Sequence, residues 1–203
     1  MPHFLKMGVI LMAVGLIATA ILAGVEGVTR EPIAQTQRQE LLNALAKVMP
    51  KGFDNAPEKD SVQLTDKRIN RQEKPVSFYR ARKGKDPLAV AFMVSAPDGY
   101  SGTIDILMGV DAQGAVTGVQ IVSHAETPGL GDKIVKTDWP KAFLGKSLKN
   151  AKWGVKKDGG EFDQFAGATI TPRAVVGAIK RGLEYYAENQ DKIFKTPSAE
   201  SAP

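Results

Sequence analysis

A ten-residue stretch near the C-terminal end has the residue types of an anion-binding loop. It reads Asp163-Gln-Phe-Ala-Gly-Ala-Thr-Ile-Thr-Pro172. The small residues allow a ligand close to the backbone. The helix predicted to follow offers unpaired N–H groups and the positive end of its dipole, worth about 0.3–2 kcal/mol for a bound anion. The Thr169 hydroxyl would then lie beside a bound phosphate. A purely structural turn, in which Thr171 caps the helix and Gly167 supplies a bend, fits the same residues.

A second segment, from His124 to Asp132, is expected to form a fixed loop. Three of the four residues from Pro128 to Gly131 are proline or glycine, which disfavour both helix and strand. The segment follows a predicted strand and carries Glu126 and Thr127 as polar groups at its base. Such a loop can cover a planar ligand with exposed backbone N–H groups. A tight structural turn with a hydrogen-bonded histidine is the alternative.

The composition excludes several kinds of chemistry. The 203 residues include no cysteine and only two histidines, His3 and His124. Disulfides, thiolate metal sites, cysteine-ligated clusters, a cysteine nucleophile and a multi-histidine metal site are therefore excluded. The net charge of +5 is small and scattered, so it does not indicate a nucleic-acid partner. Any redox chemistry here needs an organic cofactor.

The N-terminal region indicates a membrane anchor. No charged residue occurs in the 19 residues from Met7 to Val25. A helix of that length spans about 28 Å, close to the hydrocarbon core of a bilayer. Lys6 precedes the run, so the positive-inside rule places residues 1–6 in the cytoplasm and the chain after the anchor (7–27) outside. A signal peptide cleaved after Ala20 is the alternative, but cleavage there would leave an apolar new terminus.

The remaining chain is expected to be one α+β domain. Pro32 suits the first position of an amphipathic linking helix within residues 28–50. The domain would occupy residues 51–195, and the polar residues 196–203 would form a disordered tail. Alternation and turn residues predict an antiparallel meander, a short helix over Ile134–Leu144, and a C-terminal helix capped by Thr171. The expected strands are Val62–Leu64, Val76–Ala81, Leu88–Ser95, Thr103–Val110, Val116–Ser123 and a last one at Trp153–Val155.

Together the two loop segments resemble a known family. Asp163-x-x-Ala166-Gly167-Ala168-Thr169 is similar to the flavinylation motif, and His124-x-Glu126-Thr127-Pro-Gly-Leu130-Gly131 is similar to the H-x-E-T-P-G-L-G loop of the same FMN-binding domain. The order of the motifs and the N-terminal anchor also match. The resemblance covers essentially the whole chain after the anchor. It favours the G subunit of the Rnf (Rsx) ion-translocating electron transport complex over its longer relative, the C subunit of the sodium-pumping NADH:quinone reductase.

That resemblance implies covalent FMN, attached through its phosphate to Thr169. Thr171 is the only rival acceptor nearby, and the family prefers serine or threonine where this chain has Ala166. The phosphate charge would be balanced by the helix start and by Lys133 or Arg173. The residues implied around the cofactor are Asp163, Ala166, Gly167, Ala168 and Thr171 in the motif, and Glu126, Thr127, Leu130 and Gly131 in the loop.

The implied function is an electron relay within a membrane-bound, ion-translocating oxidoreductase complex. Its partners would be the other subunits of the complex and a separate flavin transferase, which uses FAD and a divalent metal. The domain would lie on the periplasmic side of the bacterial inner membrane. Two other functions remain open at this point. The chain can be a stand-alone extracytoplasmic flavoprotein reductase, or an anchored assembly module that carries no flavin.

Overall fold

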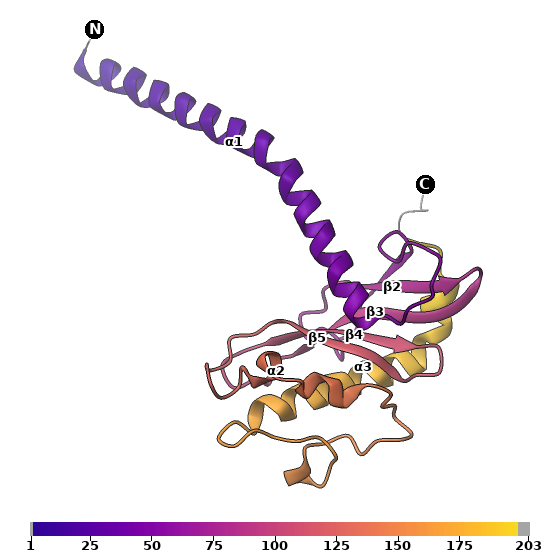
Figure 1. Ribbon diagram of the computed structural model, residues 1–203. Coiled ribbons are helices and arrows are strands. Elements are labelled where there is room, and N and C mark those ends of the chain that lie inside the picture. Colours follow the sequence, from indigo (N-terminus) through magenta and orange to yellow (C-terminus); the bar gives the residue numbers. More distant parts are fainter. Residues whose placement is uncertain (1, 199–203) are drawn as a thin grey trace. The chain divides into compact units, whose positions relative to one another are not determined.

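A computed structural model describes residues 2–198, which divide into two compact units on either side of the Leu42–Asn43 bond. The first unit is most of helix α1 (His3–Val48), drawn in Figure 1 as one continuous coil. This helix is long and apolar enough to cross a membrane. Of the expected tail, residues 196–198 follow the last helix without regular structure, and residues 199–203 lie outside the described part.

The expected helix start at Pro32 is wrong, because Pro32 lies inside α1. Proline has no N–H and costs about 3 kcal/mol inside a helix. Pro32 cannot donate the hydrogen bond that this position would otherwise make to the carbonyl of Val28. The residues on both sides remain helical, so the apolar and amphipathic stretches form a single helix.

The second unit is built on a five-stranded antiparallel meander, as the alternating pattern predicted. The strand order is β1-β2-β3-β4-β5, and each strand pairs with the next one in sequence. The bounds are β1 (Ser61–Leu64), β2 (Val76–Lys83), β3 (Asp86–Ala96), β4 (Ile104–Asp111) and β5 (Val116–Ser123).

The C-terminal helix α3 (Ile170–Lys195) covers one face of this sheet (Figure 1). Its apolar stripe, which includes Val175, Ile179 and Leu183, is buried in the core. Gly182 allows a close approach, because a Cβ there would lie 2.6 Å from the sulfur of Met108. The helix is therefore fixed against β3 and β4, and this contact sets the position of its N-terminal end.

The segment between β5 and α3 is less regular than predicted. The expected helix over Ile134–Leu144 is two short pieces, α2 (Lys133–Lys136) and the 3-10 helix η1 (Trp139–Phe143), because Pro140 cannot donate the hydrogen bond that would join them. The expected strand at Trp153–Val155 is wrong. Val155 makes only a single bridge to Phe162, and the 3-10 helix η2 (Lys156–Asp158) follows it.

The last turn of α1 packs on the other face of the sheet, within the second unit. Val48 is fully buried, and its carbonyl accepts a hydrogen bond of 2.5 Å from the Thr117 hydroxyl. A Cβ at Gly118 would lie 2.9 Å from the Lys47 carbonyl oxygen, and a Cβ at Gly109 would collide with the Val48 carbonyl. Two glycines on neighbouring strands thus form a notch that receives this helix end.

Candidate functional site

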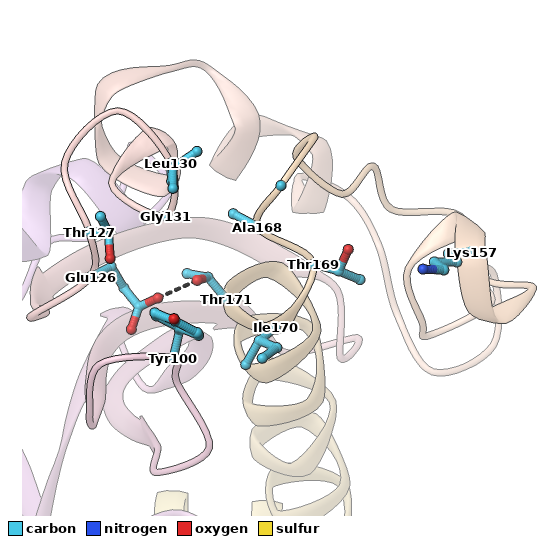
Figure 2. A pocket seen from close by; sticks show the side chains of 11 residues that line it. Tyr100, Glu126, Thr127, Leu130, Gly131, Lys157, Ala168, Thr169, Ile170 and Thr171 are labelled. Atoms are coloured by element: carbon cyan, nitrogen blue, oxygen red, sulfur yellow. Dashed lines mark hydrogen bonds between the residues drawn. The ribbon is translucent and has the colours of Figure 1, made fainter.

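One cavity brings the two candidate loops together. Its volume is about 590 Å³, within the range of about 300–1,000 Å³ typical of cofactor and ligand sites. Its walls come from the turn after β3, the loop after β5, η2 and the start of α3 (Figure 2). The lining residues are Tyr100, Glu126, Thr127, Leu130, Gly131, Lys157, Gly167, Ala168, Thr169, Ile170 and Thr171.

The side chain of Glu126 connects these walls. It is only 4% exposed, and its Oε1 atom accepts a hydrogen bond of 3.0 Å from the Ser101 N–H. The other carboxylate oxygen accepts a short hydrogen bond from the Thr171 hydroxyl, drawn as a dashed line in Figure 2. The Glu126 N–H donates to Nδ1 of His124 at 3.2 Å. One carboxylate thus touches the turn of Tyr100 and the first turn of α3.

Thr171 does not cap α3, so that prediction is wrong. The helix begins at Ile170, and Thr169 occupies the N-cap position without a side-chain capping bond. Thr171 is 1% exposed, and its hydroxyl is engaged by Glu126. Thr169 is half-buried, and within residues 2–198 its hydroxyl makes no hydrogen bond. Of the two threonines, Thr169 presents the available hydroxyl to the cavity.

Asp163 and Ala166 do not line the cavity. The Asp163 carboxylate pairs with Nζ of Lys156 at 2.6 Å. Arg173, considered as a phosphate partner from the sequence, forms two hydrogen bonds to Asp158, at 2.6 and 2.9 Å. These bonds hold the pKa of Asp158 below its ordinary value. Lys133, the other residue considered, is not among the lining residues.

An aromatic cluster packs against the segment 162–165, which precedes Thr169. The Trp139 ring meets Phe165 edge-on at 5.6 Å and Phe143 at 5.1 Å between ring centroids. Phe143 stacks on Phe162 at 4.5 Å, and Trp153 lies against both. The indole N–H of Trp139 donates to the Asp163 carbonyl at 2.8 Å. The ring packing and this directed hydrogen bond therefore both help to hold this segment.

We expect Trp139→Phe to destabilise the second unit by about 1 kcal/mol, because the ring packing is largely kept while the bond to the Asp163 carbonyl is lost. Trp139→Ala should cost about 3–5 kcal/mol, because it also leaves a cavity in the aromatic cluster. Urea unfolding of the two variants beside the unaltered chain measures the difference. A Trp139→Phe variant as stable as the unaltered chain would contradict the role given to the indole N–H, and equal losses for the two substitutions would contradict the role given to the ring packing.

Three lining residues were not among the predicted site residues: Tyr100, Lys157 and Ile170. Tyr100 lies between Gly99 and Gly102, and this glycine-bracketed turn is a signal that the sequence does contain. Lys157 reaches the cavity from η2, twelve residues before Thr169. One lysine among many in residues 133–157 carries no pattern that would have singled it out.

Comparisons with known proteins show the family to which this chain belongs. The profile of the FMN-binding domain matches residues 99–184, and that of the RnfG N-terminal region matches residues 2–48. The G subunit of the ion-translocating oxidoreductase complex of Shewanella loihica is 43% identical, over 90% of this chain and 89% of its own length. The same protein of Pseudomonas aeruginosa is 42% identical, over 96% and 94%. The chain belongs to the RnfG family.

Within this RnfG-family chain, every residue that lines the cavity lies inside the range matched by the FMN-binding domain. The corresponding protein of Aliivibrio fischeri is 43% identical over 95% of this chain and 94% of its own. Among solved structures, NqrC of Shewanella oneidensis is similar with a TM-score of 0.47 and 21% identity, covering 70% of this chain and 71% of that one.

Proposed function

We propose that this chain carries FMN bound through its phosphate to Thr169, and that it relays electrons as a subunit of a membrane-bound ion-translocating oxidoreductase complex. The observation that supports this most is the convergence of two motifs on one cavity. Thr169 and the loop residues Glu126, Thr127, Leu130 and Gly131 are 38 or more residues apart in sequence, yet they line the same cavity. The relatives' name supports the place in a complex.

The lining residues fit the parts of FMN. The first N–H groups of α3 and the ammonium of Lys157 suit the negatively charged phosphate, and the Thr169 hydroxyl suits the attachment. Leu130, Ile170 and Tyr100 offer apolar surface for the flavin ring. Gly167 has φ +77°, so the motif glycine takes a conformation that other residues rarely adopt, next to the attachment point. Once bound, FMN supplies the electron transfer, and the chain supplies position and electrostatics.

Attachment requires an outside catalyst in this proposal. The Thr169 oxygen would form a bond to the FMN phosphorus of FAD, the pyrophosphate bond would break, and AMP would leave with the hydroxyl proton transferred to a base. A threonine hydroxyl is a weak nucleophile without such a base. Within residues 2–198 no side chain accepts a hydrogen bond from Thr169. A flavin transferase with FAD and a divalent metal supplies both the base and the leaving-group activation.

The intact mass of the chain, purified after expression with and without a flavin transferase, tests the proposal. A gain equal to FMN less one water, only with the transferase, is the expected result. No gain in either sample would overturn the proposal and favour the flavin-free assembly module. Fast multiple turnover of the purified flavinylated chain with soluble donors and acceptors would favour a stand-alone reductase over a relay.

We expect Lys157→Gln to weaken the binding of free FMN to the flavin-free chain by about tenfold, because one charge-assisted contact to phosphate is lost. Riboflavin, which has no phosphate, should bind the variant and the unaltered chain alike. Lys149→Gln is the matched control, since Lys149 is exposed and does not line the cavity. Fluorescence titration measures the affinity of the two variants and the unaltered chain for each ligand. If Lys157→Gln weakened riboflavin binding as much as FMN binding, the phosphate contact would be contradicted.

For topology, we infer that residues 7–27 cross the inner membrane, that residues 1–6 are cytoplasmic, and that residues 28–50 link the anchor to a periplasmic domain, residues 51–195. The position of Lys6 before the apolar run supports this orientation. Alkaline phosphatase fused after residue 203 should be active, because it folds only outside the cytoplasm. Activity of a cytoplasmic reporter fused at the same place would contradict the orientation.

A further inference from the structure

Glu126 is a buried carboxylate without a cationic partner among residues 2–198. Its two oxygens accept hydrogen bonds from the Ser101 N–H and the Thr171 hydroxyl, both of which are neutral donors. No Lys or Arg side chain of the described residues forms an ion pair with it. Burying a charge without a counter-charge is costly, so such a group is kept only where donors are closely arranged around it.

The backbone around Glu126 is shaped to admit this carboxylate. A Cβ at Gly131 would lie 2.8 Å from Glu126 Oε2 and 2.9 Å from the Thr171 hydroxyl oxygen. A Cβ at Gly99 would lie 3.0 Å from Glu126 Oε1. The turn of Tyr100, the loop after β5 and the first turn of α3 therefore close around one side chain. Each of these three segments contributes to the cavity wall.

We propose that Glu126 is a positioning residue that joins these three walls, and that its charge holds the reduction potential of the bound flavin low. The second part rests on the proposed function. Reduction adds electrons to the flavin, and a negative charge on the wall of the same cavity opposes that addition. Charges beside a flavin are among the means by which a protein tunes its electronics. A low reduction potential suits an electron relay, because it makes the reduced flavin a stronger electron donor to the next carrier.

Two variants separate the charge from the contact. Glu126→Gln keeps the size of the side chain and removes the charge. Thr171→Val keeps the charge and removes one hydrogen bond to it. Both loosen the junction of the walls, but only Glu126→Gln should favour the reduced flavin. We expect that substitution to shift the two-electron reduction equilibrium about tenfold toward the reduced form, which corresponds to about 30 mV.

The measurement is a spectroelectrochemical titration of the flavinylated full chain with redox mediators. The expected result is a raised midpoint potential for Glu126→Gln and an unchanged or lowered one for Thr171→Val. A potential that is unchanged or lowered in Glu126→Gln would overturn the electrostatic role. Equal upward shifts in both variants would also overturn it, because loosened walls alone would then explain the effect.

The joining role is tested without any flavin. In the flavin-free full chain, hydrogen exchange at the Ser101 amide should be at least about tenfold faster in Glu126→Ala than in the unaltered chain, because that amide loses its acceptor. Exchange in the core of β4 should stay the same. Unchanged exchange at Ser101 would overturn the joining role. Failure of the unaltered chain to take up FMN would overturn the proposed function and leave this measurement of the junction standing.

Discussion

Replacing Thr169 by alanine is expected to abolish covalent flavin attachment and to leave the fold intact. Thr169 presents a hydroxyl to the cavity that is not hydrogen-bonded within residues 2–198, so its loss removes the acceptor oxygen of the proposed phosphoester. The side chain does not cap α3, so the change in unfolding free energy should stay within about 0.5 kcal/mol. Intact mass and in-gel flavin fluorescence measure the attachment, and thermal unfolding measures the stability.

Two further variants serve as controls for this result. Thr169→Ser keeps a hydroxyl at the same place and should retain attachment, at a reduced rate. Thr171→Val removes the rival hydroxyl, which is buried and bound to Glu126, and should also retain it. Full flavinylation of Thr169→Ala would show that the acceptor is assigned to the wrong threonine.

The second large effect is expected at the notch that receives the end of α1. Gly118→Ala would place a Cβ in collision with the Val48 Cα, 2.9 Å from the Lys47 carbonyl oxygen and 3.0 Å from the Val48 carbonyl carbon. All three neighbours are backbone atoms, so relief requires the helix end or strand β5 to move. Overpacking of a buried contact typically costs about 1–3 kcal/mol, and we expect about 3 kcal/mol here because no side chain can rotate away. Urea unfolding of the full chain in detergent measures the loss.

Gly177→Ala is the matched control for that substitution. A Cβ at Gly177 meets only the end of the flexible Arg181 side chain, at 3.4 Å. Alanine in the interior of α3 should therefore be neutral or stabilise the chain by up to about 1 kcal/mol. If Gly118→Ala unfolded at the same urea concentration as the unaltered chain, the close packing of Val48 against the sheet would be contradicted.

The sheet was predictable from the sequence because its signals are local. Ile104, Ile106, Met108 and Val110 alternate along β4 and belong to the core that α3 covers, and turn residues separate each pair of strands. An up-and-down meander needs no further information, since neighbours in sequence are neighbours in space. The candidate loops were predictable for a different reason, which is the resemblance of their residue patterns to a family motif.

What was not predictable depends on contacts between distant segments. The capping role of Thr171 was wrong because Glu126, 45 residues earlier, takes its hydroxyl. The residues around Thr171 and around Glu126 contain no pattern that predicts this hydrogen bond. Lys157 was not predicted because it reaches the cavity from η2, a short 3-10 helix that the sequence pattern did not indicate. A strand at Trp153–Val155 was expected just before it, in a glycine-rich segment with glycines at 154, 159 and 160. The helix start expected at Pro32 was wrong because proline is common at the first position of a helix but here lies inside α1.

Peptide mass spectrometry can show which threonine carries the flavin. Trypsin should release the peptide Asp158–Arg173 from the flavinylated chain, and its only hydroxyl side chains are Thr169 and Thr171. Fragmentation between Ile170 and Thr171 assigns the flavin to one of them. We expect the added mass of FMN less one water on fragments that contain Thr169, with Thr171-Pro172-Arg173 unmodified. The added mass on the Thr171-Pro172-Arg173 fragment, or an unmodified peptide from a chain that carries covalent flavin, would contradict it.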